Sequence, residues 1–263
     1  WSPPDWMAKT DPVAKFERFR ASLPQDAPGE PVVLPAEEVS CGNREGRNVH
    51  LIAIDHPHYI PGQGDGGRRW LDNRPDLSIR QVLERLRSSN APAIAAHPRP
   101  GIGIAERLIF RRGDYDLTDI GDGVTGVQFW NGGLGNDFRQ GRALWVADLL
   151  RGNRRMPIAG NDAHGDLNRA TQVKTPLFSL RQTRSHRFGH ARTWVHPDQA
   201  PSRASIRTAL SGGAPTVISN GPWLGLRVPG AARSVERSSN GSVSIDAKSI
   251  VEFGTIAKIR LFG

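Results

Sequence analysis

Short apolar segments alternate with helix-forming segments through the middle of the chain. Four segments rich in Val, Ile and Ala stop at turn-forming residues, as buried strands do: residues 49–55, 91–97, 124–130 and 156–160. Between them, residues 77–89 and 141–150 carry apolar side chains at helical spacing, and Asp76 is the expected N-cap of the first helix. This alternation is typical of βα units around a parallel sheet or barrel, so we expect an α/β domain.

The segments before this alternation predict one helix and one further strand. The helix is expected within Pro12–Ser22, among the prolines of the first thirty residues. An apolar run from Pro31 to Pro35, which leads into Ala36–Val39, predicts the strand.

The C-terminal part of the chain changes in character. Residues 192–219 still predict a strand, a helix and a strand, whereas only strand-like pieces follow Gly221, at residues 224–228, 242–245 and 256–262. We therefore predict one domain over residues 1–221 and the start of a β-rich module over residues 222–263.

The net charge of +9 comes almost entirely from arginine, because the chain has only five lysines. The arginines are scattered rather than gathered in a run, so we expect a small-molecule partner rather than nucleic acid, although the charge keeps a nucleic-acid role open. No stretch approaches the eighteen apolar residues of a membrane span. A single cysteine, Cys41, allows no internal disulfide but leaves the compartment open, cytoplasmic or exported, and composition does not fix the oligomeric state.

Five potential metal ligands lie at the ends of predicted strands: Glu38, His50, His97, Asp162 and His164. Strand termini in parallel α/β folds converge on one face, so such side chains can meet there. Imidazole with carboxylate is the ligand set of Zn²⁺, Mn²⁺ and Fe²⁺ sites. Each residue also has a plainer interpretation, such as a core histidine for His50 or a turn residue for His97.

In their order along the chain, these motifs resemble the polymerase-and-histidinol-phosphatase (PHP) family of metallohydrolases. The resemblance rests on the segment Ala36–Ser40, then His50, then Ala96-His97-Pro98, then Trp130-Asn131, and finally the Gly160–His164 segment. The stretch from Ala209 to Pro222 is similar to the branch that includes carbaryl hydrolase, in which an Asn-Gly-Pro turn leads into a β-sandwich.

The resemblance implies a distorted (β/α)7 PHP-type barrel, followed by a small β-sandwich-like module. It also implies two or three divalent metal ions (Zn, Mn or Fe), which activate a water for attack on a phosphoester or on a carbamate or carboxylic ester. The alternative is a catalytically incomplete PHP-like module that binds carbohydrate or protein.

The chain departs from the family pattern at two points. The family opens with His-x-His and Asp-His, and no histidine precedes Glu38 here. We expect that pair upstream of Trp1, so that this chain is incomplete at its N-terminus. Gln128 stands where many relatives carry glutamate, and a neutral amide is a poorer ligand.

Four further features are candidates for roles near the site. Arg99 is placed to clamp an anionic substrate oxygen or is an ordinary loop arginine. Asn131 is expected to line the pocket beside Trp130, although a tryptophan there more often packs. His56 and His58 either add to the site or bind substrate, or are parts of a surface loop, and the loop is the favoured interpretation. Cys41, in an expected Ser-Cys-Gly turn without a neighbouring base, makes covalent catalysis a weaker alternative.

Overall fold

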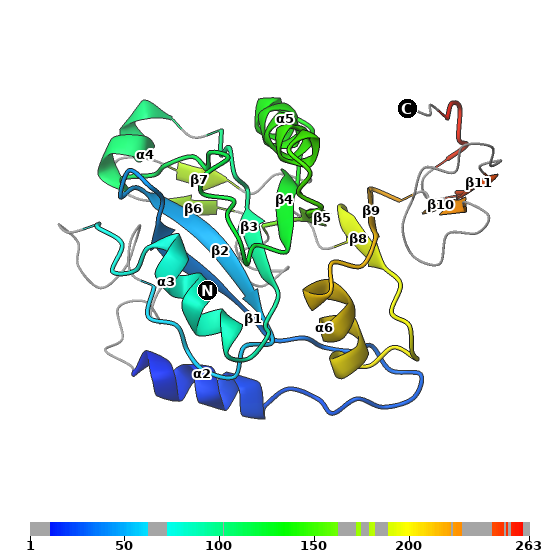
Figure 1. Ribbon diagram of the computed structural model, residues 1–263, viewed down its shortest axis with the longest axis horizontal. Coiled ribbons are helices and arrows are strands. Elements are labelled where there is room, and N and C mark those ends of the chain that lie inside the picture. Colours follow the sequence, from blue (N-terminus) through cyan, green and yellow to red (C-terminus); the bar gives the residue numbers. More distant parts are fainter. Residues whose placement is uncertain are drawn as a thin grey trace.

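The centre of the protein is a five-stranded mixed sheet (Figure 1). The computed structural model describes residues 11–62, 73–101, 103–162, 172–174, 179–181, 189–221, 223–227, 244–249, 251 and 254–259. The sheet has the order β1 (Ala36–Gly42), β2 (Asn48–Ile54), β3 (Ala93–Ala96), β4 (Gly126–Asn131), β5 (Met156–Gly160). The two pairs β1–β2 and β2–β3 are antiparallel, and β3–β4 and β4–β5 are parallel. The α/β class is therefore confirmed.

The direction of β1 and β2 differs from the all-parallel arrangement that the alternation predicts. Only residues 43–47 join the two strands, in a turn where Asn43 Oδ1 accepts the backbone N–H groups of Glu45 and Arg47. Parallel neighbours need a crossover of a dozen or more residues, so this connection forces a hairpin. Over the described ranges the sheet is open, and strands that would close it into a barrel are not among them.

Strand β1 begins at Ala36, so the predicted strand is confirmed over Ala36–Val39, whereas its apolar first part, Pro31–Pro35, lies outside the sheet. Proline has no N–H to donate to a ladder, and two prolines in five residues break the pairing. The more polar segment that follows pairs with β2 instead, in the register Glu38↔Ile52. This places a carboxylate inside the ladder rather than at a solvated strand end.

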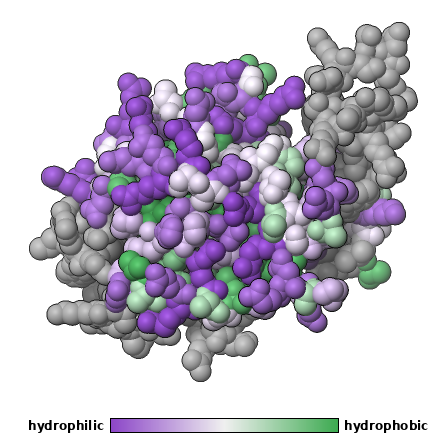
Figure 2. Space-filling model, turned by 60° about the horizontal axis from the view of Figure 1, so that its bottom comes forward, coloured by the Kyte–Doolittle hydropathy of each residue, from purple (hydrophilic) through white to green (hydrophobic). Residues whose placement is uncertain are grey.

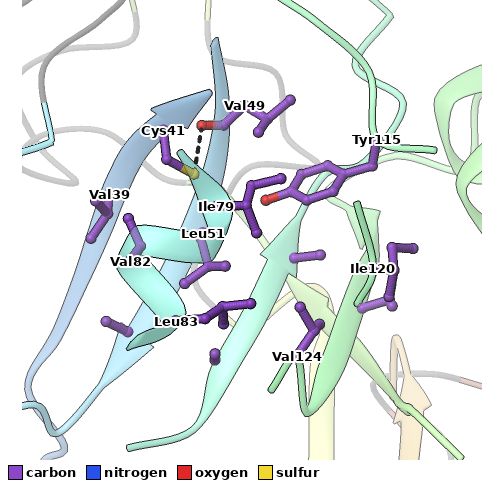
Figure 3. Close-up of a cluster of buried hydrophobic side chains, with 14 of the residues drawn as sticks. Val39, Cys41, Val49, Leu51, Ile79, Val82, Leu83, Tyr115, Ile120 and Val124 are labelled. Atoms are coloured by element: carbon purple, nitrogen blue, oxygen red, sulfur yellow. Dashed lines mark hydrogen bonds between the residues drawn. The ribbon is translucent and has the colours of Figure 1, made fainter. Parts of the chain in front are cut away.

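The two faces of β2 have different environments. Val49, Leu51 and Ala53 are buried against one core cluster, whereas His50 and the isoleucines at 52 and 54 face the other side and are half-buried. The first cluster lies between the sheet and α3 (Ile79–Arg87), whose Val82 and Leu83 point toward the strands (Figure 3). The second face is covered in part by α6 (Arg203–Ser211) and β8 (Arg192–Val195).

Helix α3 is capped by Ser78 rather than by the predicted Asp76. The Ser78 side chain accepts the Gln81 backbone N–H at 3.3 Å, and Gln81 Oε1 accepts the Ser78 backbone N–H at 2.8 Å. This reciprocal pair satisfies two N–H groups at once, which a lone aspartate two residues earlier cannot do.

Three other helices complete the described core of the fold. Helix α2 (Pro12–Ala21) confirms the predicted N-terminal helix, α4 spans Ile104–Ile109, and α5 (Asn136–Leu150) packs on β4. Helix α5 begins five residues before the predicted start at Gly141, with Gly135 as its N-cap.

The C-terminal strands form separate antiparallel pairs. Strands β8 and β9 (Thr216–Ser219) flank α6 but pair antiparallel, so they are not the parallel βα unit that was predicted. The remaining pairs are β6 (Gln172–Lys174) with β7 (Ser179–Arg181), and β10 (Trp223–Arg227) with β11 (Ser244–Lys248). The strand predicted over 256–262 is not seen at residues 256–259, and its remainder lies outside the described residues.

The surface in view in Figure 2 is covered mainly by hydrophilic side chains, with hydrophobic ones singly or in small groups between them. Among the described helices, none is both long enough and apolar enough to cross a membrane.

Candidate metal centre

Three of the predicted ligands meet on one face of the sheet. The ladder pairs His50 with Ser40 on one side and with Ala96 on the other. Because side chains alternate along a strand, Glu38 shares the face of Ser40, and therefore that of His50. His97 follows Ala96 directly, where β3 ends. The hairpin thus brings a residue from the middle of β1 to the same edge as the ends of the neighbouring strands.

The three side chains are in direct contact. Glu38 Oε1 lies 2.5 Å from His50 Nδ1 and 2.9 Å from His97 Nε2, and the two ring nitrogens are 3.2 Å apart. The imidazole rings meet edge to face, with centroids 5.0 Å apart. Of the residues that the structure describes, these form the one group of three ligating side chains whose ligand atoms lie within 4.8 Å of one another.

The electrostatics of the group favour an ionised carboxylate. Burial raises the pKa of Glu38, but hydrogen bonds and charge from His50 and then His97 outweigh it, so that the pKa falls well below its usual value. The carboxylate is nevertheless 38% exposed, so it is accessible from solvent. A negative ligand beside two imidazoles is the donor set expected for a divalent transition metal.

The neighbouring carboxylate behaves differently. Glu37 lies on the opposite face of β1, where Glu37 Oε2 accepts the Ile60 backbone N–H at 3.1 Å. Burial raises the pKa of Glu37 to about 7, and the Ile60 hydrogen bond offsets only part of that effect. The two adjacent glutamates therefore separate into one buried structural group and one ionised group at the candidate centre.

Two residues from the segment after α4 contact His50, one at the ring and one at the backbone. Arg112 Nη1 donates to His50 Nε2 at 2.5 Å, and the Tyr115 hydroxyl donates to the His50 backbone oxygen at 2.6 Å. With Nε2 accepting, the ring proton of His50 lies on Nδ1, which donates to Glu38. The sequence did not single out Arg112 or Tyr115, because they lie in an irregular loop with no period or motif.

One of the three separations between the ligand atoms already matches that of ligands on one metal ion. Ligands about 2.0–2.1 Å from a tetrahedral Zn²⁺ lie roughly 3.3 Å from one another. The separation of the His50 and His97 nitrogens, 3.2 Å, already matches this distance. The Glu38 oxygen is closer because it is hydrogen-bonded to both rings, and a partly exposed side chain can retreat by the required fraction of an ångström.

The two remaining predicted ligands do not join this group among the described residues. Asp162 follows β5 at the same edge, and its Oδ2 accepts the Asn131 side-chain N–H at 3.0 Å. It does not belong to the group of three ligands. His164 lies outside the described residues. Asn131 ends β4, and its Oδ1 is buried without a hydrogen-bond partner.

Local backbone geometry also marks this edge of the sheet. His97 and Asp162 have φ values of 29° and 48°, which residues other than glycine seldom adopt. Such conformations are concentrated at functional sites. At Gly160, a Cβ atom would collide with Gln128 Nε2, so this side chain lies directly against the backbone before Asp162.

Other candidate groups lie elsewhere. His56 is buried beyond the far end of β2, roughly 20 Å along the strand from His50, where its Nδ1 lies 2.9 Å from Ser89 Oγ. Its neighbour His58 is exposed, as expected for a loop. Cys41 lies within β1 rather than in the predicted turn, fully buried with Sγ directed at the Val49 carbonyl (Figure 3). A thiol so placed cannot reach a substrate.

Arg99 lies beside the carboxylate of Asp114. Its Nη1 lies 3.6 Å from Asp114 Oδ2, and Arg107 makes the closer contacts to the same carboxylate, at 3.0 and 3.1 Å.

Searches among protein-family models, curated proteins and solved structures found no match to this chain.

Proposed function

We propose that the protein is a metal-dependent hydrolase whose metal is held by Glu38, His50 and His97. The observation that carries the proposal is the contact of one ionised carboxylate oxygen with two imidazole nitrogens, from three adjacent strands. The ordered motifs that resemble the PHP family support the same function. The PHP-type barrel, the β-sandwich module and further metals with Asp162 and His164 as ligands are parts of this proposal.

The metal, once bound, would polarise the scissile group and lower the pKa of a water to about 7. The protein residues supply position and charge. Glu38 neutralises one unit of positive charge, and its exposed side leaves room for a substrate. The Tyr115 hydroxyl fixes the backbone of His50. The substrate is a phosphoester, or a carbamate or carboxylic ester.

A turnover assay tests the proposal. The full chain, stripped with a chelator and reloaded with Zn²⁺, Mn²⁺ or Fe²⁺, is assayed against aryl phosphate mono- and diesters, an aryl acetate and an aryl carbamate. We expect one class to be hydrolysed by the loaded protein. Glu38→Gln should lower that rate about a hundredfold or more, because even outer-shell partners are worth 10–100-fold.

Glu84→Gln is the matched control, since Glu84 is exposed on α3. Hydrolysis that survives both chelation and Glu38→Gln would show that the activity comes from another site. Equal rates with and without metal for every substrate class would favour the alternative, a metal-poor binding module. One observation favours this alternative: Arg112 lies in close contact with His50, and its positive charge opposes a metal ion there.

Arg112 should weaken metal binding rather than support it. A metal on His50 Nδ1 requires the ring proton to move to Nε2, where it would meet the Arg112 donor at 2.5 Å. Arg112→Gln removes the cation and offers an acceptor, as metal-bound histidines usually have. We expect zinc affinity to rise about tenfold, measured by competition with a chromophoric chelator.

Arg111→Gln is the control for this change, because Arg111 is adjacent in sequence and exposed. Its zinc affinity should equal that of the wild type. An Arg112→Gln variant that binds zinc more weakly would mean that Arg112 supports the ligand orientation instead.

A further inference from the structure

A polar cavity of about 220 Å³ lies beside the candidate metal centre. Three arginines and four carboxylates line it: Arg47, Arg99 and Arg107, with Glu45, Asp114, Asp116 and Asp119. Gly113 allows two walls of the cavity to lie close together, because a Cβ at that position would lie 2.7 Å from the Arg47 Cβ. The cavity has the size of a small polar group rather than of a whole drug-sized ligand.

The cavity and the metal centre share a wall. Gly113 and Tyr115 line the cavity and also a crevice beside His50 and His97 that is too small to hold a water molecule. The Tyr115 backbone N–H donates to the Pro98 carbonyl at 2.9 Å, which fixes this wall to the loop that carries His97. Arg99 lies two residues beyond His97, so their Cα atoms are at most about 7 Å apart. The cavity and the candidate metal centre are therefore neighbours along this loop.

Two carboxylates of the cavity, those of Asp116 and Asp119, already accept hydrogen bonds from the protein. Asp119 accepts the backbone N–H groups of Arg44 and Asp116, at 2.8 and 3.0 Å. Asp116 accepts from Thr118 and from the Asp119 backbone, and these bonds lower its pKa. Burial outweighs the bonds to Asp119 and raises its pKa. Asp116 is ionised but already accepts hydrogen bonds, and the charged form of Asp119 is disfavoured, so both oppose an incoming anion less than free carboxylates would.

The arginines are less fully used. Arg107 binds Asp114 through two nitrogens, but Arg99 reaches that carboxylate only at 3.6 Å and is 31% exposed. Two guanidinium groups thus share one carboxylate. Within the described part of the chain, the Arg47 guanidinium pairs with the exposed Glu45, at 3.2 Å, a kind of pair that is worth little in water. Planar guanidinium donors with unused N–H groups are suited to bidentate recognition of an oxyanion.

We propose that this cavity binds an oxyanion of the substrate, a phosphate or carboxylate group, through Arg99 with Arg47 and Arg107. The proposal rests on the proposed function only in the statement that the anion belongs to the substrate of the metal centre. It restricts the substrates to molecules with a negative group within a few ångströms of the scissile bond.

Anion binding by metal-free protein tests this without any turnover. Isothermal titration calorimetry of the full chain in chelator uses inorganic phosphate in one arm and acetate in the other, at constant ionic strength. Arg99→Gln should weaken binding of the preferred anion about ten- to a hundredfold, the worth of a hydrogen bond to a charged group. Arg99→Lys keeps the positive charge but loses the planar, bidentate donor geometry of the guanidinium. Its anion affinity should therefore lie between those of the wild type and Arg99→Gln. The arm with the tighter binding identifies the group as phosphoryl or carboxylate.

Arg142→Gln, an exposed arginine on α5, controls for net charge and should bind as the wild type does. Thermal melts confirm that each variant folds. Zinc affinity, measured separately, should be unchanged in Arg99→Gln. If the wild type fails to bind zinc but binds the anion through Arg99, the proposed function fails and the anion site stands. If neither anion binds, or Arg99→Gln binds as tightly as the wild type, the anion site is wrong whatever zinc does.

Discussion

His97→Ala is expected to lower the zinc affinity of the protein more than about a hundredfold, because a lost ligand costs more than the 10–100-fold of an outer-shell partner. His97 Nε2 is one of three ligand atoms and already lies 3.2 Å from His50 Nδ1, near the separation that a tetrahedral ion needs. Two ligands remain in the variant, and they hold a zinc ion far less tightly than three. The measurement is competition with a chromophoric chelator at fixed pH, since metal binding displaces protons.

His58→Ala is the matched control for this prediction. His58 is exposed in the loop after β2 and touches His56 but none of the three ligands. The control should bind zinc as the wild type does. Equal affinity of the wild type and His97→Ala would show that zinc is bound elsewhere.

Asp148→Ala is expected to destabilise the fold by about 3–5 kcal/mol, the usual cost of leaving a buried charge without its partner. Asp148 on α5 has no exposed surface, accepts the Asn153 side-chain N–H at 2.8 Å and lies 3.4 Å from Arg155 Nε. Arg155 in turn donates to the carbonyls of Val124 and Gly121, ahead of β4. Removal of the carboxylate leaves this guanidinium, only 14% exposed, without its counter-charge.

Urea denaturation measures this effect through the midpoint, with an unchanged slope as evidence that the native state is intact. Asp122→Ala is the control, because Asp122 is exposed and should change stability by no more than about 0.5 kcal/mol. A loss below about 1 kcal/mol for Asp148→Ala would mean that Arg155 finds another partner or water. Both predictions separate the metal centre from the scaffold, since Asp148 lies on a helix remote from the hairpin that carries Glu38.

Much of the fold follows from local pattern, and the exceptions have identifiable physical causes. Strands β5 and β9 begin and end where their apolar runs do. Strand direction was the main error, because the short connection after Gly42 decides the pairing of β1 and β2, and a run of apolar residues carries no information about direction. The N-cap was misplaced for a similar reason, since two reciprocal bonds at Ser78 prevail over a single aspartate.

The candidate site was predictable where it depends on strand ends and unpredictable where it depends on loops. Glu38, His50 and His97 lie together, but the β1–β2 hairpin brings Glu38 there from the middle of its strand, so convergence of strand ends accounts for only part of the group. Asp162 lies at the same edge and bonds to Asn131, but metal binding by Asp162 or His164 stays a prediction. Arg112 and Tyr115 reach His50 from a loop whose path follows from tertiary contacts alone. The same loop also contributes Gly113, Asp114 and Tyr115 to the lining of the polar cavity.

The most direct test of the metal centre is anomalous X-ray diffraction from crystals of the full chain equilibrated with Zn²⁺. We expect a zinc peak about 2.0–2.2 Å from Glu38 Oε1, His50 Nδ1 and His97 Nε2, with the Arg112 guanidinium moved away from His50. A zinc peak bound elsewhere, with the Glu38 hydrogen bonds to both histidines intact, would contradict the metal site and the hydrolase proposal that depends on it.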